Sequence, residues 1–105
     1  MIWKVIAVNS KIKDNNTDFL LSAILKLETL EECYAFFEDA LTSKEIVEIA
    51  QRLKAAKMLR AGRSYQEVCE ETGMSSATIS RVSKSLEKGA GGYKLILERT
   101  EGKNN

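Results

Sequence analysis

This chain of 105 residues has no histidine, no proline and only two cysteines, Cys33 and Cys69, which lie far apart. Without histidine or a C-x-x-C spacing, the sequence indicates neither a zinc site nor a His-based catalytic centre, and it implies no metal and no cofactor. The absence of proline, with only six glycines, favours helices joined by short connections. We therefore predict an all-α protein with reduced thiols.

Long apolar runs are also missing. No stretch reaches the length of a membrane span, and the N-terminal MIWKVIAV lacks the small-residue cleavage pattern of a secretory signal. We expect no membrane partner and a cytoplasmic location. The carboxylates fall on predicted solvated helix faces and neither cysteine has an activating setting, so we do not expect an enzyme.

The net charge is +1, but acidic and basic residues are distributed unevenly along the chain. Residues 14–50 carry two basic and nine acidic side chains, a net of −7, whereas residues 51–88 carry eight basic and four acidic ones, a net of +4. Binding to nucleic acid needs such a local cationic excess rather than a basic whole chain. The acidic block is expected to face away from DNA.

Residues 64–87, SYQEVCEETGMSSATISRVSKSLE, predict a helix-turn-helix. Ser64 and Glu67 have the spacing of a capping box, in which each side chain satisfies a free backbone N–H. Gly73 supplies the left-handed conformation that ends the first helix at low cost. Two short helices joined by a turn that contains glycine form the arrangement whose second helix enters the major groove of DNA.

The second helix is predicted over residues 76–87, with Ser75 as its N-cap. The apolar side chains that form a small core inside the motif are Val68, Met74, Ile79 and Val82, with Cys69 at the helix crossing. The outer face carries small and cationic side chains, whereas a face meant for water more often carries Glu and Gln. The residues predicted to contact DNA are Gln66, Ser75, Ser76, Ala77, Thr78, Ser80, Arg81 and Lys84.

Arg81 and Lys84 are long enough to reach guanine O6 and N7, while Ala77 and Thr78 suit a thymine methyl group. An ordinary helical hairpin with a serine-rich surface is the alternative structural interpretation. A protein-interaction module built on the same scaffold is the alternative function.

A long helix is predicted over residues 43–61, where Thr42 and Glu45 form another capping box and Gly62 ends the helix. Its apolar residues at helical spacing are Ile46, Ile49, Leu53, Ala56 and Leu59. The basic residues toward its end are Arg52, Lys54, Lys57, Arg60 and Arg63. These cations form either a solvated face or phosphate contacts.

A first helix opens at Thr17 or Asp18, and seven of the nine residues 19–27 are apolar. A helix that is hydrophobic on every side must be buried on every side. A chain of this size does not easily surround such a helix, and burial against a second copy solves the problem. This segment therefore predicts a homodimer.

Thr29 and Glu32 form a capping box for a helix over residues 30–41. Its apolar stripe, expected to be core, consists of Tyr34, Phe37 and Leu41, with Leu30 and Cys33 beside them. Residues 1–16 are expected to form a flexible N-terminal arm; a short strand, or a basic arm that touches DNA through Lys4, Lys11 and Lys13, is the alternative.

Residues 89–92 (GAGG) are too flexible to be more than a connection, and they lack the flanking residues of a phosphate-binding loop. A last short helix is predicted over 93–99, and the tail, 102–105, is expected to be disordered. We thus predict a single all-helical DNA-binding domain over 17–101.

Residues 41–86, LTSKEIVEIAQRLKAAKMLRAGRSYQEVCEETGMSSATISRVSKSL, resemble the Trp repressor superfamily. The resemblance rests on Leu41-Thr42 opening a long helix, Arg52 within it, Gly62 closing it, and the run Ala77-Thr78-Ile79-Ser80-Arg81. It extends over residues 17–100, and the upstream EECYAFFEDALT is more similar to the YerC/YecD branch than to the repressor itself.

The resemblance implies an intertwined homodimer with about six helices per chain, whose two helix-turn-helix heads reach successive major grooves of double-stranded DNA. It also implies a transcriptional regulator, expected to be a repressor, in the bacterial cytoplasm or nucleoid. A regulator that responds to a small molecule other than tryptophan is the alternative.

The family's corepressor, tryptophan, lies between two arginines whose counterparts here are Arg52 and Arg81. Thr42 and Ser85 match other positions that line that pocket. The glycine that follows the second arginine in the repressor, where the indole needs room, is Val82 in this chain. Because a filled site does not admit a bulky ring without strain, we expect weak or absent tryptophan binding.

Overall fold

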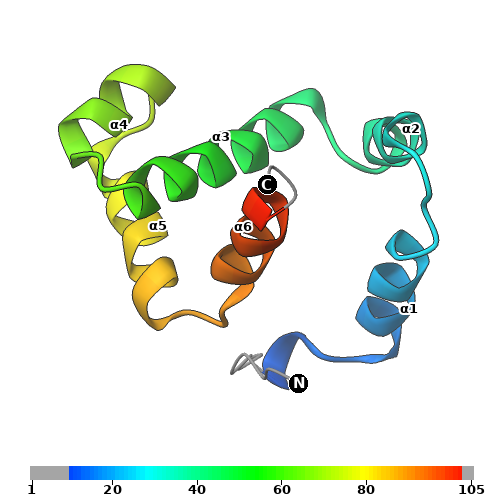
Figure 1. Cartoon of the computed structure of the whole chain (residues 1–105). Helices are drawn as coiled ribbons and strands as arrows, with labels where there is room; N and C mark the ends of the chain where they lie inside the picture. Colours follow the sequence, from blue (N-terminus) through cyan, green and yellow to red (C-terminus); the bar gives the residue numbers. More distant parts are fainter. Residues whose placement is uncertain (1–9, 103–105) are drawn as a thin grey trace. The chain divides into compact units, whose positions relative to one another are not determined.

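The computed structural model of the chain describes residues 10–102, and every regular element in that range is helical. A short 3₁₀ turn, Ser10–Ile12, precedes six α-helices: α1 Asn15–Ile24, α2 Leu30–Ala40, α3 Ser43–Arg60, α4 Tyr65–Thr72, α5 Ser76–Lys88 and α6 Gly92–Gly102 (Figure 1). The predicted all-α class is confirmed. The described backbone divides into two compact units, residues 10–48 and residues 49–102.

The first helix begins earlier than expected, because Asp14 rather than Thr17 or Asp18 is its N-cap. The carboxylate of Asp14 accepts a hydrogen bond of 2.7 Å from the backbone N–H of Thr17, and this bond lowers the pKa of Asp14. Within the predicted arm, residues 10–12 form the 3₁₀ turn and α1 begins at Asn15, while residues 1–9 lie outside the described range. At the other end α6 continues to Gly102, so the predicted tail is helical as far as the structure describes it.

The structure contains the predicted hydrogen bonds at the N-termini of α2 and α3, except that Glu32 bonds to a different residue. Thr42 accepts a hydrogen bond from the backbone N–H of Glu45, whose carboxylate accepts one of 2.8 Å from the backbone N–H of Thr42. Thr29 likewise caps α2 by accepting from the N–H of Glu32. The carboxylate of Glu32, however, reaches past Thr29 to the backbone N–H of Glu28.

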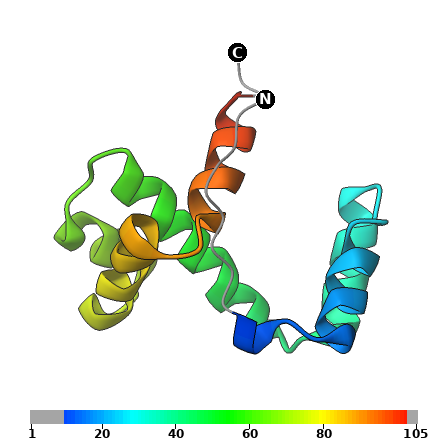
Figure 2. The same ribbon diagram turned by 90° about the horizontal axis from the view of Figure 1, so that it is seen from below.

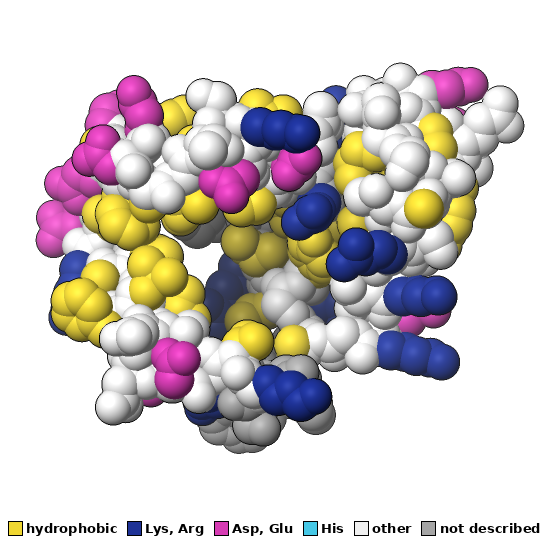
Figure 3. All heavy atoms as spheres, turned by 180° about the vertical axis from the view of Figure 1, so that it is seen from behind, with side chains coloured by type: hydrophobic (Ala, Val, Ile, Leu, Met, Phe, Trp, Pro, Cys, Tyr) yellow, Lys and Arg dark blue, Asp and Glu magenta, His cyan; other side chains and the backbone are white. Residues whose placement is uncertain are grey.

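The unit formed by residues 10–48 has no buried residue in either α1 or α2. Phe19 is 77% exposed and Leu25 84% exposed, and Figure 3 shows hydrophobic side chains at the surface over α1. The α2 stripe was predicted to be core, but Leu30 and Tyr34 are exposed in the single chain. The reason is that this unit contains too few residues to enclose both helices.

The unit formed by residues 49–102 has a true core. Figures 1 and 2 both place α4 and α5 against the C-terminal half of α3. The buried hydrophobic residues are Ala55, Ala56, Met58, Val68, Ile79, Val82 and Leu97, which form one cluster. Val68 and Ile79 are fully buried, as predicted, whereas Met74 and Cys69 only pack against the cluster's edge.

Of the apolar residues singled out on the long helix α3, Ala56 belongs to this core, and Leu53 and Leu59 pack against it. Ala55 and Met58 are buried, while Ile49 is 53% exposed. Gly62, with φ of 91°, then ends the helix, as predicted.

Candidate nucleic-acid interface

The turn between α4 and α5 is fixed by backbone and side-chain hydrogen bonds. Gly73 has φ of 73°, a left-handed conformation in which its N–H reaches the carbonyl oxygen of Cys69 at 2.8 Å. A residue with a Cβ is strained there. The hydroxyl of Thr72 donates to the carbonyl oxygen of Val68 at 2.6 Å and accepts from the backbone N–H of Met74 at 3.2 Å. The direction in which the chain enters α5 is thus determined.

The N-termini of both helices of the motif are capped as predicted. Ser64 and Glu67 form a complete capping box, with bonds of 3.1 and 2.9 Å. The hydroxyl of Ser75 accepts from the backbone N–H of Thr78 at 3.2 Å and lies 3.0 Å from the Thr78 hydroxyl. Helices α4 and α5 therefore have the geometry of a helix-turn-helix.

The predicted DNA-contacting side chains lie on the accessible part of α4 and α5. Ser75, Ser76, Ala77, Arg81, Lys84 and Gln66 are exposed, while Thr78 and Ser80 are half-buried. The intervening Ile79 and Val82 face the core, so the exposed set occupies the opposite side of α5. Figure 3 shows Lys and Arg side chains gathered over the α5 part of the surface.

Two predicted contact residues already have partners within the chain. The amide of Gln66 donates to the carboxylate of Glu70 at 3.3 Å, and the hydroxyl of Thr78 lies against Ser75. Arg81 and Lys84 have no ion pair with any described residue, so their charges remain available to an external anion.

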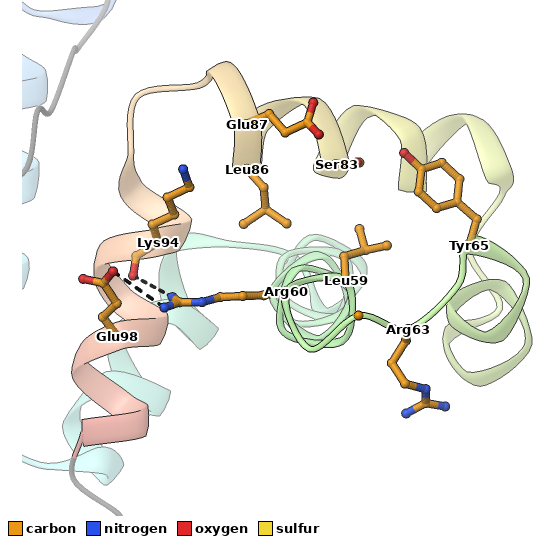
Figure 4. Close-up of a pocket in the computed structure, with 10 residues that line it drawn as sticks. Leu59, Arg60, Arg63, Tyr65, Ser83, Leu86, Glu87, Lys94 and Glu98 are labelled. Carbon is orange, nitrogen blue, oxygen red and sulfur yellow. Dashed lines mark hydrogen bonds and ion pairs between the residues drawn. The ribbon is translucent and has the colours of Figure 1, made fainter.

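The basic residues near the end of α3 differ in their surroundings. Arg60 turns to α6, where it donates to the carbonyl oxygen of Lys94 at 3.2 Å and lies 3.6 Å from a carboxylate oxygen of Glu98 (Figure 4). Lys54 and Arg63 pair with carboxylates of α4. Of the basic residues near the end of α3, only Arg52 and Lys57 lack an ion pair with a described residue. Most of these cations are therefore already paired with carboxylates of this chain.

One carboxylate of α4 joins two of these cations. Glu71 lies 3.2 Å from Nη2 of Arg63 and 3.7 Å from Nζ of Lys54. Nε of Arg63 is also 3.4 Å from Glu67. The hydrogen bond to Glu71 raises the pKa of Arg63, and the bond from the Ser64 backbone, helped by Arg63, lowers the pKa of Glu67.

The residues of the predicted effector pocket are placed as follows. Arg52, Arg81 and Ser85 are exposed residues of the 49–102 unit. Thr42 belongs to the other unit, where it caps α3. Val82 is only 3% exposed and is part of the buried cluster formed with α3.

A hollow of about 560 Å³ lies between the ends of α3, α5 and α6. Two leucines, Leu59 and Leu86, point into it, and Arg63 points away (Figure 4). Its arginines are already bound to carboxylates of α4 and α6. Tyr65, Ser83, Glu87 and Lys94 also line the hollow.

Sequence reasoning missed two residues of this region. Thr72 is buried and connects both sides of the turn; the signal was a hydroxyl residue directly before the turn glycine, since such side chains readily bond to nearby backbone. Glu71 was missed because its cationic partners come from a different helix. Within residues 10–102, no group of three or more His, Cys, Asp or Glu is placed to hold a metal ion.

Comparison with known proteins gives concordant results. The family model described as Trp repressor protein matches residues 15–101. A protein of Bacillus subtilis (strain 168), described as uncharacterized protein YerC, is 46% identical over 91 residues, which is 87% of this chain and 88% of that protein.

Two crystal structures have a similar fold. A TrpR-like protein from Eubacterium eligens matches with a TM-score of 0.85 and 47% identity, over 89% of this chain and 96% of that one. A putative Trp repressor from Staphylococcus aureus matches with a TM-score of 0.84 and 46% identity, over 88% and 92%. No helix within residues 10–102 is long and apolar enough to cross a membrane.

Proposed function

The chain belongs to the Trp repressor family, and we propose that it is a sequence-specific DNA-binding protein that acts as a homodimeric repressor of transcription. Members of this family are helix-turn-helix regulators rather than enzymes. The observation that carries the proposal is the geometry of α4 and α5. Their turn is fixed by Gly73 and Thr72, and α5 presents one continuous accessible face.

In the proposed complex α5 enters the major groove and α4 crosses the phosphate backbone. The first turn of α5 brings Ser76 and Ala77 to base edges, and their small side chains allow close approach. Arg81 and Lys84 reach guanine or phosphate from the next turns. The backbone N–H groups at the start of α5 add a favourable site for a phosphate oxygen.

The homodimer is supported by the exposed apolar side chains of the 10–48 unit. Leucines and aromatic rings of α1 and α2 are left in contact with water in the single chain, and no residue of either helix is buried. Such surfaces on a chain of this size mark an interface. Two copies place two α5 helices in successive grooves, with half-sites about 34 Å apart or a multiple of it.

We also propose that tryptophan is not its effector. Val82 is 3% exposed, and a branched side chain in place of the repressor's glycine is expected to crowd an indole ring. If an effector exists, the unpaired Arg52 and Arg81 favour an anion that needs less space. Calorimetry with tryptophan tests the first statement, and thermal stabilisation of the folded dimer by a panel of metabolites tests the second.

The deciding experiment is the recovery of genomic fragments by the purified protein, followed by sequencing, at a low and at a high salt concentration. A sequence-specific dimer enriches one palindromic motif, and recovery falls steeply at high salt because bound cations release counterions from DNA. An absence of salt-dependent DNA binding would overturn the proposal and favour a protein-interaction module. Enrichment without a palindrome would contradict the dimer alone.

A further inference from the structure

We propose that Glu71 limits the sequence-independent affinity of this protein for DNA, because it neutralises two cations, Lys54 and Arg63, that otherwise strengthen binding to phosphate. The inference rests on the proposed DNA binding, but it concerns a residue that makes no DNA contact of its own. Its role is exerted through the two basic side chains that it holds.

The geometry assigns each oxygen of the Glu71 carboxylate to a different cation. Oε1 lies 3.2 Å from Nη2 of Arg63, and Oε2 lies 3.7 Å from Nζ of Lys54. Lys54 belongs to α3, and Arg63 follows that helix, whereas Glu71 is in the last turn of α4. Two positive charges of the basic segment are thus held by the first helix of the motif.

In the proposed complex these charges lie on and beside the helix that crosses the phosphate backbone. In a helix-turn-helix complex the first helix crosses the phosphate backbone. Helix α4 has eight residues and is about 12 Å long, and electrostatic interactions persist over about 8 Å at physiological ionic strength. A cation that is bound to a carboxylate releases fewer counterions from DNA than a free one, so the pairing lowers the affinity and its salt dependence.

Stability does not require this arrangement. The side chains of Lys54 and Glu71 are about half exposed, at 50% and 48%, and exposed ion pairs contribute little to folding. The main physical consequence of the contacts is therefore the cancellation of charge. Five cations of residues 51–88 remain without an ion pair to any described residue: Arg52, Lys57, Arg81, Lys84 and Lys88.

The test compares Glu71→Gln with Glu70→Gln on a random-sequence duplex over a series of salt concentrations. Both variants remove one negative charge from α4, but Glu70 accepts a hydrogen bond from Gln66 and is not ion-paired with a described cation. Glu71→Gln is expected to steepen the slope of log K against log salt by about 0.9 per chain, because it frees Lys54, whereas Arg63 keeps its ion pair with Glu67 at 3.4 Å. Glu70→Gln is expected to change it less.

A second pair of variants tests whether the change in salt dependence comes from Lys54. Lys54→Gln is expected to leave the slope of the wild-type protein nearly unchanged, because that charge is already neutralised. In the Glu71→Gln background the same substitution is expected to lower the slope by about 0.9. Thermal unfolding of each variant serves as a folding control, and a purely structural role of Glu71 would change melting without changing the slope.

The outcomes separate the inference from the proposed function. Equal slopes for Glu71→Gln and Glu70→Gln, or a slope that does not change in either, overturn the inference while DNA binding by the wild type stands. A Lys54→Gln effect of the same size in both backgrounds also overturns it. If the wild-type chain shows no salt-dependent DNA binding, the proposed function fails and the inference fails with it.

Discussion

The hydroxyl of Ser75 accepts the backbone N–H of Thr78 at 3.2 Å and lies 3.0 Å from the Thr78 hydroxyl, which makes one side chain both the cap of α5 and the anchor of its first turn. Ser75→Ala removes both bonds. We expect a loss of about 1 kcal/mol in the free energy of unfolding, the usual cost of losing a serine cap.

Thermal unfolding at a fixed protein concentration measures this loss, with Ser76→Ala as the matched control because Ser76 is exposed and does not cap the helix. Equal melting temperatures for the two variants would show that the Ser75 cap contributes nothing. The affinity for DNA is expected to fall by more than the loss of folding stability explains. The reason is that Ser75→Ala also leaves the first turn of α5 less firmly held.

Arg81→Ala tests the reading of bases by α5. Arg81 is exposed and has no ion pair with a described residue, so its loss does not expose a buried partner. We expect about 1–3 kcal/mol weaker binding to the selected operator and relaxed preference at one base position. Arg99→Ala, which removes a cation of α6, is the control, and an unchanged binding isotherm and sequence preference for Arg81→Ala would contradict the assignment.

The motif was predictable from sequence because its signals are local. Capping residues, the turn glycine and the alternation of buried and exposed positions in α5 all act within a few residues of one another. The same holds for the caps of α2 and α3. Asp14 was missed as a cap because two further candidates, Thr17 and Asp18, follow it closely.

Contacts between helices were less predictable. Nothing in the sequence near Arg60 indicates that it turns to Lys94 and Glu98 of α6, or that Glu71 holds two cations of another segment. On α3 the predicted stripe included Ala56, which is buried, but it left out Ala55 and Met58, which are also buried. Such choices depend on how close the neighbouring helices come, which periodicity does not encode.

Acid is expected to destabilise the protein through its capping carboxylates. The pKa of Glu67 is lowered by the hydrogen bond from the Ser64 backbone and by Arg63, and the pKa of Glu45 is lowered by the bond from Thr42. A lowered folded-state pKa contributes stability above the unfolded value of about 4.3, and that contribution disappears as pH falls through the folded-state pKa.

Thermal unfolding between neutral and acidic pH measures this dependence. The melting temperature is expected to stay level near neutral pH and to drop below about pH 4.5. Glu67→Gln is expected to flatten the drop, whereas Glu87→Gln, which removes a carboxylate that caps no helix, is expected to leave it in place. Identical acid profiles for wild type and Glu67→Gln would rule out this contribution.

Val82 is expected to affect both the stability of the core and the binding of tryptophan. Its side chain is 3% exposed, so Val82→Ala removes two buried methyl groups and is expected to cost about 2 kcal/mol of unfolding free energy. In calorimetry the wild-type protein is expected to give no binding heat with tryptophan. Tight binding of tryptophan would show that the valine does not crowd the ring.

The dimer is expected to depend on α1, whose apolar side chains lie in water in the single chain. Leu25 is 84% exposed and Phe19 77% exposed. In a monomer, Phe19→Glu therefore removes no buried contact and costs little. In a dimer that covers α1, the same substitution places a charge in an apolar interface, where desolvation is expensive.

Sedimentation velocity distinguishes these cases. The wild-type chain is expected to sediment as a dimer, and Phe19→Glu as a monomer or a much weaker dimer with its helices retained. Asn16→Glu adds the same charge to an exposed polar position of α1 and is expected to leave the dimer intact. If Phe19→Glu and Asn16→Glu both sediment as the wild-type dimer does, α1 is not part of the interface, and the exposed faces of α2 and of the N-terminal half of α3 become the surfaces that a second copy covers.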